Sequence, residues 1–187
     1  MHNAAAGSEV RVLRTGLKEK LAPFLLTVGI IIVDQITKSL VVAFIPPVHQ
    51  SGYALPVIGD FLRIIHARNP GVAFSIGHAL PDHLRVLLFT LLPVAVLGTL
   101  VVYYFRSRDL SALQRWSVAG IVGGGLGNLI DRALRPHGVV DFIDVKFFGL
   151  FGLERWPTFN VADASVVVCG ILLVVTIFFD ERKQDHE

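Results

Sequence analysis

A run of 20 residues without a charged side chain, Val86 to Phe105, constrains the fold of this chain more than any other feature of its sequence. About 20 apolar residues in a helix are enough to cross the hydrocarbon core of a bilayer. Pro93 lies inside the run and predicts a kink there. The whole chain has a mean hydropathy of +0.62, and only 17% of its residues are charged, which is too apolar for a soluble domain. The sequence therefore predicts an integral membrane protein.

Three further segments complete a set of four expected transmembrane helices in one domain of 187 residues. The expected spans are about 21–45, 86–105, 114–133 and 159–179. The first is longer than the apolar stretch of a cleavable signal peptide and shows no small-residue cleavage site, so we expect it to be retained. The third is the weakest. Its glycines have GxxxG spacing, which lets helices approach closely in lipid; they are Gly120, Gly123, Gly124 and Gly127.

Two segments between the spans, about 46–83 and 134–158, are expected to lie outside the cytoplasm. The first combines turn residues with the apolar stretches Phe61–Ile65 and Val72–Ile76, which favours a small antiparallel sheet on the membrane surface. The second carries aromatic residues suited to the membrane interface; they are Phe147, Phe148, Phe151 and Trp156. The expected fold is thus an all-α membrane protein with four transmembrane helices and a small extracytoplasmic β-rich segment.

The distribution of Lys and Arg indicates the orientation of the chain. The two ends and the loop 106–115 hold 9 Lys and Arg in 38 residues, whereas the segments 46–83 and 134–158 hold 5 in 63. The side denser in positive charge is usually cytoplasmic. We therefore expect both termini in the cytoplasm.

Polar residues inside the spans require a reason, because a charge in the bilayer costs roughly 2.5–3.5 kcal/mol on insertion scales. The expected intramembrane polar residues are Asp34, Lys38, Asn128, Asp131, Arg132, Asn160 and Asp163, and Asp141 follows the third span closely. Asp34 lies 13 residues into its helix, which is about 20 Å from the cytoplasmic end. Several segments thus bring polar groups to one depth, and this predicts a single site near the outer surface.

Structural roles account for several of these residues. Asp34 and Lys38 are four residues apart on one helix face and can neutralise each other. Asp131 beside Arg132 could form an ion pair that fixes the fold. The side chains of Asn128 and Asn160 could form hydrogen bonds between helices. For each of them a structural and a functional interpretation remain open.

Asp141 and Asp163 differ from the other carboxylates because neither has a Lys or Arg within four residues along the chain. Two carboxylates held close together share a proton, so one can activate water while the other polarises a carbonyl. Such a pair hydrolyses peptides without a metal. The alternative is a structural carboxylate at a helix N-terminus. Asp144, one turn further along than Asp141, is expected to be solvated and outside the site.

Other chemistries find little support in the sequence. Cys169 is the only cysteine and lies in an apolar run, so it forms no internal disulfide and is expected in the core. The histidines of the first outer segment, His66, His78 and His83, lack metal-ligand spacing and are expected at the surface. We expect no metal and no cofactor. The net charge of +2 and the lack of a dense basic run argue against nucleic acid as a partner.

Five short motifs occur in a fixed order along residues 21–179. They are Asp34-Gln35-Ile36-Thr37-Lys38, Arg68-Asn69-Pro70-Gly71-Val72-Ala73-Phe74, Gly127-Asn128-Leu129-Ile130-Asp131-Arg132, Val139-Val140-Asp141-Phe142 and Phe159-Asn160-Val161-Ala162-Asp163. Any one of them is weak, but all five in order are highly specific. The chain in this respect resembles the type II signal peptidase family, the lipoprotein signal peptidases.

The resemblance implies an aspartyl endopeptidase that cuts the signal peptide from prolipoproteins just before a cysteine carrying diacylglyceryl. It implies a multi-pass protein of the bacterial cytoplasmic (inner) membrane, with membrane lipid around it and inhibition by globomycin-type cyclic peptides. Asp141 and Asp163 would form the catalytic dyad. Supporting or substrate-binding roles would fall to Asp34, Lys38, Asn69, Gly71, Asn128, Asp131, Arg132 and Asn160. The stretch between the two dyad aspartates is somewhat long and is expected to alter the loop over the site.

Two other functions compete with this interpretation. A small proton-coupled transporter also places carboxylates in spans, but it would favour internal repeats and polar groups at mid-membrane. A non-enzymatic assembly subunit would not need two carboxylates free of basic neighbours. Neither alternative matches the residues as well as a protease does.

Overall fold

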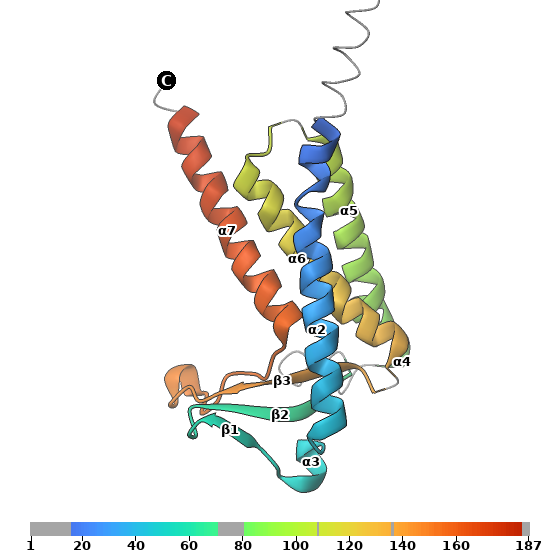
Figure 1. Ribbon diagram of the computed structural model, residues 1–187, viewed down its shortest axis with the longest axis vertical. Helices are drawn as coiled ribbons and strands as arrows, with labels where there is room; N and C mark the ends of the chain where they lie inside the picture. Colours follow the sequence, from blue (N-terminus) through green and yellow to red (C-terminus); the bar gives the residue numbers. More distant parts are fainter. Residues whose placement is uncertain (1–15, 71–80, 108, 136, 185–187) are drawn as a thin grey trace, which may run out of the picture.

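The computed structural model describes residues 16–70, 81–107, 109–135 and 137–184. Its long helices stand roughly side by side, and a small sheet lies across one end of them (Figure 1). The elements in chain order are α2 (Phe24–Phe44), α3 (Val48–Ser51), β1 (Leu55–Ile58), β2 (Leu62–Asn69), α4 (Asp82–Val86), a π-helical turn (Leu87–Leu91), α5 (Leu92–Arg106), α6 (Ala112–Leu134), β3 (Val139–Val145), a 3-10 turn (Leu150–Gly152) and α7 (Val161–Gln184).

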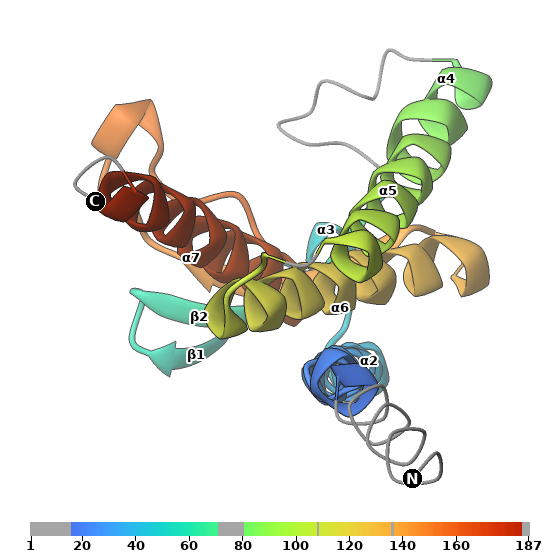
Figure 2. The same cartoon turned by 90° about the horizontal axis from the view of Figure 1, so that it is seen from above.

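Helix α6 occupies the middle of the bundle and packs against α2, α5 and α7 (Figure 2). Its glycines make this possible, because a side chain would collide with the neighbouring helices. A Cβ atom built on Gly123 would lie 3.0 Å from the Cα atom of Thr27 in α2, and one on Gly124 would run into the carbonyl oxygen of Ala162 in α7. Thr27 also donates a hydrogen bond of 2.7 Å to the carbonyl of Ala119. The close packing expected from the GxxxG spacing is therefore confirmed.

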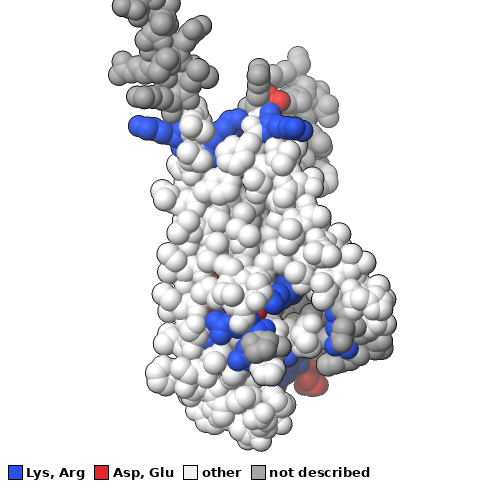
Figure 3. All heavy atoms as spheres, turned by 90° about the vertical axis from the view of Figure 1, so that its right-hand side faces the viewer, with Lys and Arg blue, Asp and Glu red and all other residues white. Residues whose placement is uncertain are grey.

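Three helical segments are long and apolar enough to cross a membrane, judged by length and composition within the described residues: Gly16–Phe44, His83–Arg106 and Val161–Phe179. Helix α6 is not among them, although it corresponds to the third expected span. Its glycines and polar residues lower its hydropathy, and it compensates by burying much of its surface against the other helices. Figure 3 shows Lys and Arg atoms near the top of one face and again in its lower part, with an uncharged band between the two groups.

The expected kink at Pro93 takes the form of a change in helix type. The apolar run begins in α4, continues through the π-helical turn and becomes regular α-helix only at Leu92. Pro93 lies in the first turn of α5, where its missing N–H costs little. The wider turn just before it accommodates the carbonyl groups that a proline leaves without a partner.

The sheet at the end of the bundle is antiparallel with the order β1-β2-β3. The expected sheet in segment 46–83 is therefore confirmed for β1 and β2, whereas the stretch Val72–Ile76 lies outside the described residues. The third strand was not foreseen, since it comes from the second outer segment. It pairs Ala67 with Asp141 and Asn69 with Val139. A bridge from Ile143 to Phe159 then leads the chain into α7.

A small apolar core fixes the sheet to the bundle. Val41 and Ile45, at the end of α2, pack against Val140 and Phe142 of β3. Alternate residues of a strand point to opposite faces, so Val140 and Phe142 face this core while Asp141 points the other way, to the side chains of Asn69 and Asn160. The register of β3 thus decides which carboxylate reaches the polar interior.

Candidate active site

Lys38 lies at the centre of a buried charge cluster between α2 and α6. Its Nζ atom is 2.8 Å from Oδ2 of Asp34 and 3.2 Å from Oδ2 of Asp131, and all three side chains are inaccessible to solvent. The expected pair of Asp34 and Lys38 is confirmed. The expected pair of Asp131 and Arg132 is wrong, because consecutive residues of a helix do not face each other. Asp131 instead pairs with Lys38 and, at 3.0 Å, with Arg135 one turn further along.

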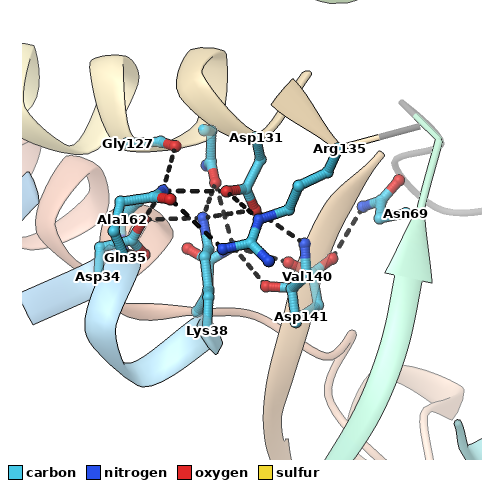
Figure 4. Close-up of polar contacts among 12 residues, drawn as sticks. Asp34, Gln35, Lys38, Asn69, Gly127, Asp131, Arg135, Val140, Asp141 and Ala162 are labelled. Carbon is cyan, nitrogen blue, oxygen red and sulfur yellow. Dashed lines mark hydrogen bonds and ion pairs between the residues drawn. The ribbon is translucent and has the colours of Figure 1, made fainter. Parts of the chain in front are cut away.

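The two carboxylates bound to Lys38 each hold a backbone amide beside one member of the expected dyad (Figure 4). Oδ1 of Asp34 accepts a hydrogen bond of 3.0 Å from the N–H of Ala162, next to Asp163. Oδ2 of Asp131 accepts one of 3.0 Å from the N–H of Val140, next to Asp141. A single buried lysine therefore ties together the start of α7 and the strand β3.

Asn160 links the two dyad residues directly. Its side-chain amide donates a hydrogen bond of 2.7 Å to Oδ1 of Asp141. Its backbone N–H donates one of 3.1 Å to Oδ2 of Asp163, whose own N–H donates back to the Asn160 side chain at 2.9 Å. This reciprocal pair caps the N-terminus of α7. The cap brings carboxylates from a strand and from a helix onto one asparagine.

Two further amides complete the hydrogen bonds of the dyad. Asn69, at the end of β2, donates to Oδ2 of Asp141 at 3.0 Å. Asn128 donates to Oδ1 of Asp163 at 2.7 Å, while its own oxygen accepts from Lys38 at 2.9 Å and from Asn160 at 3.1 Å. The bonds expected between helices from Asn128 and Asn160 are thus present, and they connect Lys38 to the dyad.

Burial raises the pKa of Asp141 from its ordinary 3.8 to about 7, and the nearby charge of Asp163 adds to the effect. Hydrogen bonds from Asn69 and Asn160 and the charge of Lys38 act in the opposite direction but are weaker. A carboxyl with a pKa near neutrality can both give and take a proton under physiological conditions. The pair therefore has the property that acid–base hydrolysis needs.

Comparison with known proteins places this arrangement in a family. The family model for signal peptidase (SPase) II matches residues 26–179. The chain belongs to the signal peptidase II family. Relatives named lipoprotein signal peptidase include one from Treponema pallidum, 49% identical over 89% of this chain and 88% of its own length, and one from Treponema denticola, 48% identical over 89% and 94%. A relative of the same name from Borreliella burgdorferi is 42% identical over 86% and 91%.

Solved structures agree with the assignment to the signal peptidase II family. A bacterial membrane enzyme that is 29% identical superposes with a TM-score of 0.71, covering 86% of this chain and 89% of the other. A second bacterial membrane enzyme, also 29% identical, superposes with a TM-score of 0.68 and covers 83% of this chain and 92% of its own. Family membership establishes a protease, so the transporter and the non-enzymatic subunit are set aside.

The signal peptidase II motifs converge at the sheet end of the bundle, where they bring together most of the residues expected in the site. Asp34, Lys38, Asn69, Asn128, Asp131, Asn160, Asp141 and Asp163 form the network described above. Arg132 is not part of this hydrogen-bond network, but its charge interacts with those of Asp163 and Asp141. It lines a cavity of about 190 Å³ together with Arg85 and Arg135. Gly71 lies outside the described residues.

Gln35 and Arg135 belong to the network but were not recognised as site residues from the sequence. The Gln35 amide donates to Oδ1 of Asp131 at 2.9 Å and to the carbonyl of Gly127 at 3.0 Å. Arg135 donates to Oδ1 of the same aspartate at 3.0 Å. The signal for Gln35 was its place beside Asp34 in the first signal peptidase II motif. No comparable signal marked Arg135, whose role depends on where α6 ends.

Two expectations about polar residues near the site are wrong. Asp144 is buried rather than solvated, because Arg63 and Arg155 approach its two oxygens at 2.7 and 2.6 Å. It lies on the face of β3 opposite to Asp141, since the two are three positions apart and side chains alternate along a strand. His66 is also buried, with Nδ1 2.8 Å from the carbonyl oxygen of Ile45. His83 is exposed as expected.

The remaining chemistry-bearing residues take no part in the signal peptidase II site. His78 lies outside the described residues. Cys169 is a free, partly buried cysteine that packs against Gly120 of α6. In the part of the chain that the structure describes, no group of three or more His, Cys, Asp or Glu is placed to hold a metal ion.

Proposed function

We propose that this member of the signal peptidase II family is an intramembrane aspartyl endopeptidase with Asp141 and Asp163 as its catalytic dyad. It removes the signal peptide from diacylglyceryl-modified prolipoproteins just before the lipidated cysteine. The observation that carries the proposal is the bridge through Asn160, which binds the buried carboxylate of Asp141 with its side-chain amide and the half-buried carboxylate of Asp163 with its backbone N–H. The raised pKa of Asp141 supports a proton shared between them.

The reaction follows from that shared proton. The ionised carboxyl takes a proton from water as the water oxygen attacks the scissile carbonyl, while the protonated carboxyl donates a hydrogen bond to the carbonyl oxygen. When the C–N bond breaks, a proton passes to the leaving nitrogen, and the dyad again holds one proton. Asn128, Asn160 and Asn69 orient the two carboxyl groups throughout.

The other residues hold the dyad or receive the substrate. Lys38, through Asp34 and Asp131, fixes the backbone next to each catalytic aspartate. Arg132 adds positive charge near the dyad, and Asn69 contacts Asp141 from the end of β2. Gly71, outside the described residues, is assigned to substrate binding by the family motif alone. The substrate is an apolar helix with lipid at its end, so it enters sideways from the bilayer and meets the site at its outer surface.

Direct evidence would come from the purified protein and a diacylglyceryl-modified prolipoprotein. We expect release of the signal peptide and inhibition by globomycin, with no cleavage of the same prolipoprotein before lipidation. Mass spectrometry of the products would locate the cut. A cut elsewhere than before the lipidated cysteine, or equal turnover of the unmodified precursor, would contradict the proposed substrate.

The proposed topology has four spans in the bacterial cytoplasmic (inner) membrane, with α6 as the third and both termini cytoplasmic. Its support is the uneven distribution of Lys and Arg, together with the described chain beginning and ending at the same end of the bundle (Figure 1). The sheet then lies outside the cytoplasm. Helix α6 crosses despite its polarity because its partners shield it.

Cysteine labelling tests this topology. In a Cys169→Ser background, a cysteine replacing His49, which is exposed in α3, should react with a membrane-impermeant reagent added to intact cells. A cysteine replacing Ser8 should react only after the membrane is opened. The opposite pattern would place the site on the cytoplasmic side.

A further inference from the structure

The segment 146–156, here called the aromatic hairpin, projects from the sheet between β3 and α7. A bridge between Lys146 and Arg155 closes its base. Backbone N–H groups of Phe147 and Gly149 donate to the carbonyls of Glu154 and Leu153 at 2.8 and 3.0 Å. The hairpin is therefore a formed structural element with a fixed tip.

Two bulky residues at the tip have a backbone conformation that normally favours glycine. Phe148 and Phe151 have φ values of 55° and 54°. For a bulky side chain this left-handed conformation is a genuine outlier, and such strain persists only where the surroundings impose it. Each of the two precedes a glycine with a φ of 77°. The turns thus force both phenylalanines into these positions.

The strained side chains point outward instead of filling a core. Phe148 is 70% exposed and Phe151 85% exposed. Each ring has one aromatic neighbour within the chain. Phe148 stacks on Phe61 with ring centroids 6.2 Å apart, and Phe151 lies 6.3 Å from Phe147, which contacts Trp156 at 5.0 Å. Residues 147–153 carry no charge, while Lys146, Glu154 and Arg155 lie at the base. The hairpin is thus apolar along residues 147–153 and charged at its base, where Lys146 Nζ lies 5.7 Å from the Phe148 ring. These contacts leave most of the surface of both rings exposed.

The position of the hairpin identifies what surrounds its tip. Figures 1 and 2 show it at the level of the sheet, extending sideways from the bundle on the side toward which the far end of α7 leans. That space is occupied by lipid when α7 crosses the membrane. Val167, Val168 and Ile171 of α7 are exposed apolar residues of the same lipid-facing surface. In the proposed topology the hairpin, at the level of the sheet, lies at the outer boundary of the membrane.

We propose that the aromatic hairpin inserts Phe148 and Phe151 into the outer leaflet of the membrane and anchors the extracytoplasmic sheet there. Aromatic rings are favoured at the boundary between headgroups and acyl chains, while the charged base remains among the headgroups. Insertion compensates for holding two phenylalanines exposed in left-handed conformations. It also fixes the depth of β3, which leads directly into the hairpin and carries Asp141.

Tryptophan fluorescence tests the insertion without reference to catalysis. The chain has two tryptophans, and replacing Trp116 and Trp156 by Phe gives a background into which Phe151→Trp is placed as the only reporter. The protein is reconstituted in phosphatidylcholine vesicles whose acyl chains carry bromine at a shallow position. We expect strong quenching of this reporter by the brominated lipid and weak quenching by acrylamide in the water.

A matched reporter on the same hairpin provides the control. Glu154→Trp, in the same background, replaces an exposed residue at the charged base. It should be quenched less by the brominated chains and more by acrylamide than the reporter at position 151. Equal quenching at both positions, or a tip reporter quenched mainly by acrylamide, would overturn the proposal. Protection of the tip that rises with protein density in the vesicles would point to a contact between proteins and would also overturn it.

A glycine substitution separates anchoring from a role in folding. Phe151→Gly relieves the left-handed strain and removes an exposed ring, so the melting temperature in detergent should stay the same or rise. In the same variant carrying Phe148→Trp, the brominated lipid should quench the remaining reporter less than with Phe151 present. A clear fall in the melting temperature would instead show that the ring supports the fold and would overturn the anchor.

Discussion

Asp141→Asn and Asp163→Asn should each reduce cleavage by on the order of 10³-fold or more while the protein remains folded. The substitution preserves size and hydrogen bonding but removes the proton that the two carboxyls exchange. The double variant should be no worse than either single one, because half a dyad is already inactive. The assay is release of the signal peptide by detergent-purified variants, with thermal melts to establish folding.

Asp144→Asn is the matched control, since it makes the same change on the same strand. Its carboxylate pairs with Arg63 and Arg155 on the opposite face of β3. We expect a lower melting temperature, because two arginines lose part of their partner, but substantial cleavage by the folded fraction. Near-normal activity in Asp141→Asn or Asp163→Asn would reject the aspartyl mechanism and direct attention to Asp131 and Asp34.

Asp141→Asn should also reveal how much stability the wild-type protein loses by burying the Asp141 carboxyl. The pKa of Asp141 is about 7 in the folded protein and 3.8 for an ordinary aspartate, so the folded state holds its proton more tightly. By linkage the wild type loses stability as the pH rises from about 4 to about 7, by up to about 4 kcal/mol, and little further above that. Asp141→Asn has no carboxyl at this position, so its stability does not fall in this way as the pH rises. Its melting temperature relative to wild type should therefore increase over this pH range.

Lys38→Met should have the second large effect, on folding rather than on the chemical step. The substitution leaves Asp34 and Asp131 buried without their shared cation, and breaking a buried ion pair in this way costs about 3–5 kcal/mol. A loss of this size should lower the melting temperature sharply and weaken globomycin binding. Adding Asp34→Asn removes one of the uncompensated charges and should restore part of the stability.

The rescue distinguishes a supporting lysine from a catalytic one. If Lys38→Met remained fully folded and bound globomycin normally, yet cleaved nothing, Lys38 would belong to the reaction itself. The Asp34→Asn single variant serves as the reference, because it alone should also be destabilised. The coupling energy between the two positions is then the change in free energy of unfolding in the double variant minus the sum of the changes in the two single variants.

The sequence predicted the helices and the site more fully than it predicted the connections between them. Charge-free runs and GxxxG spacing report lipid exposure and close packing, so α2, α5, α6 and α7 were expected near their observed positions. The strand β3 was missed because its partner β2 lies about 80 residues away, and no local signal encodes that pairing. The same pairing decided that Asp141 faces Asn69 and Asn160 while Asp144 faces the two arginines.

Polar partners were the hardest to assign from sequence alone. The pair of Asp34 and Lys38 follows from helical spacing, which is a local rule. The choice of Lys38 and Arg135 for Asp131 depends on how α6 is rotated against α2 and on where it ends. His66 was expected at the surface because a histidine in an outer loop usually is. Its burial arises from the way the end of α2 folds back onto β2.

The glycine-lined surface of α6 has a consequence for how the protein is made in the membrane. A helix with this composition gains little from lipid alone, so its place in the bilayer depends on protein neighbours. One neighbour, α2, is synthesised long before it, but Gly120 and Gly124 fit against Cys169 and Ala162 of α7, which is synthesised after α6. Until that helix arrives, Asn128 lacks two of its partners, Asn160 and Asp163. The packing of α7 against the glycines of α6 and the arrival of Asp163 at the proposed catalytic site are therefore the same step.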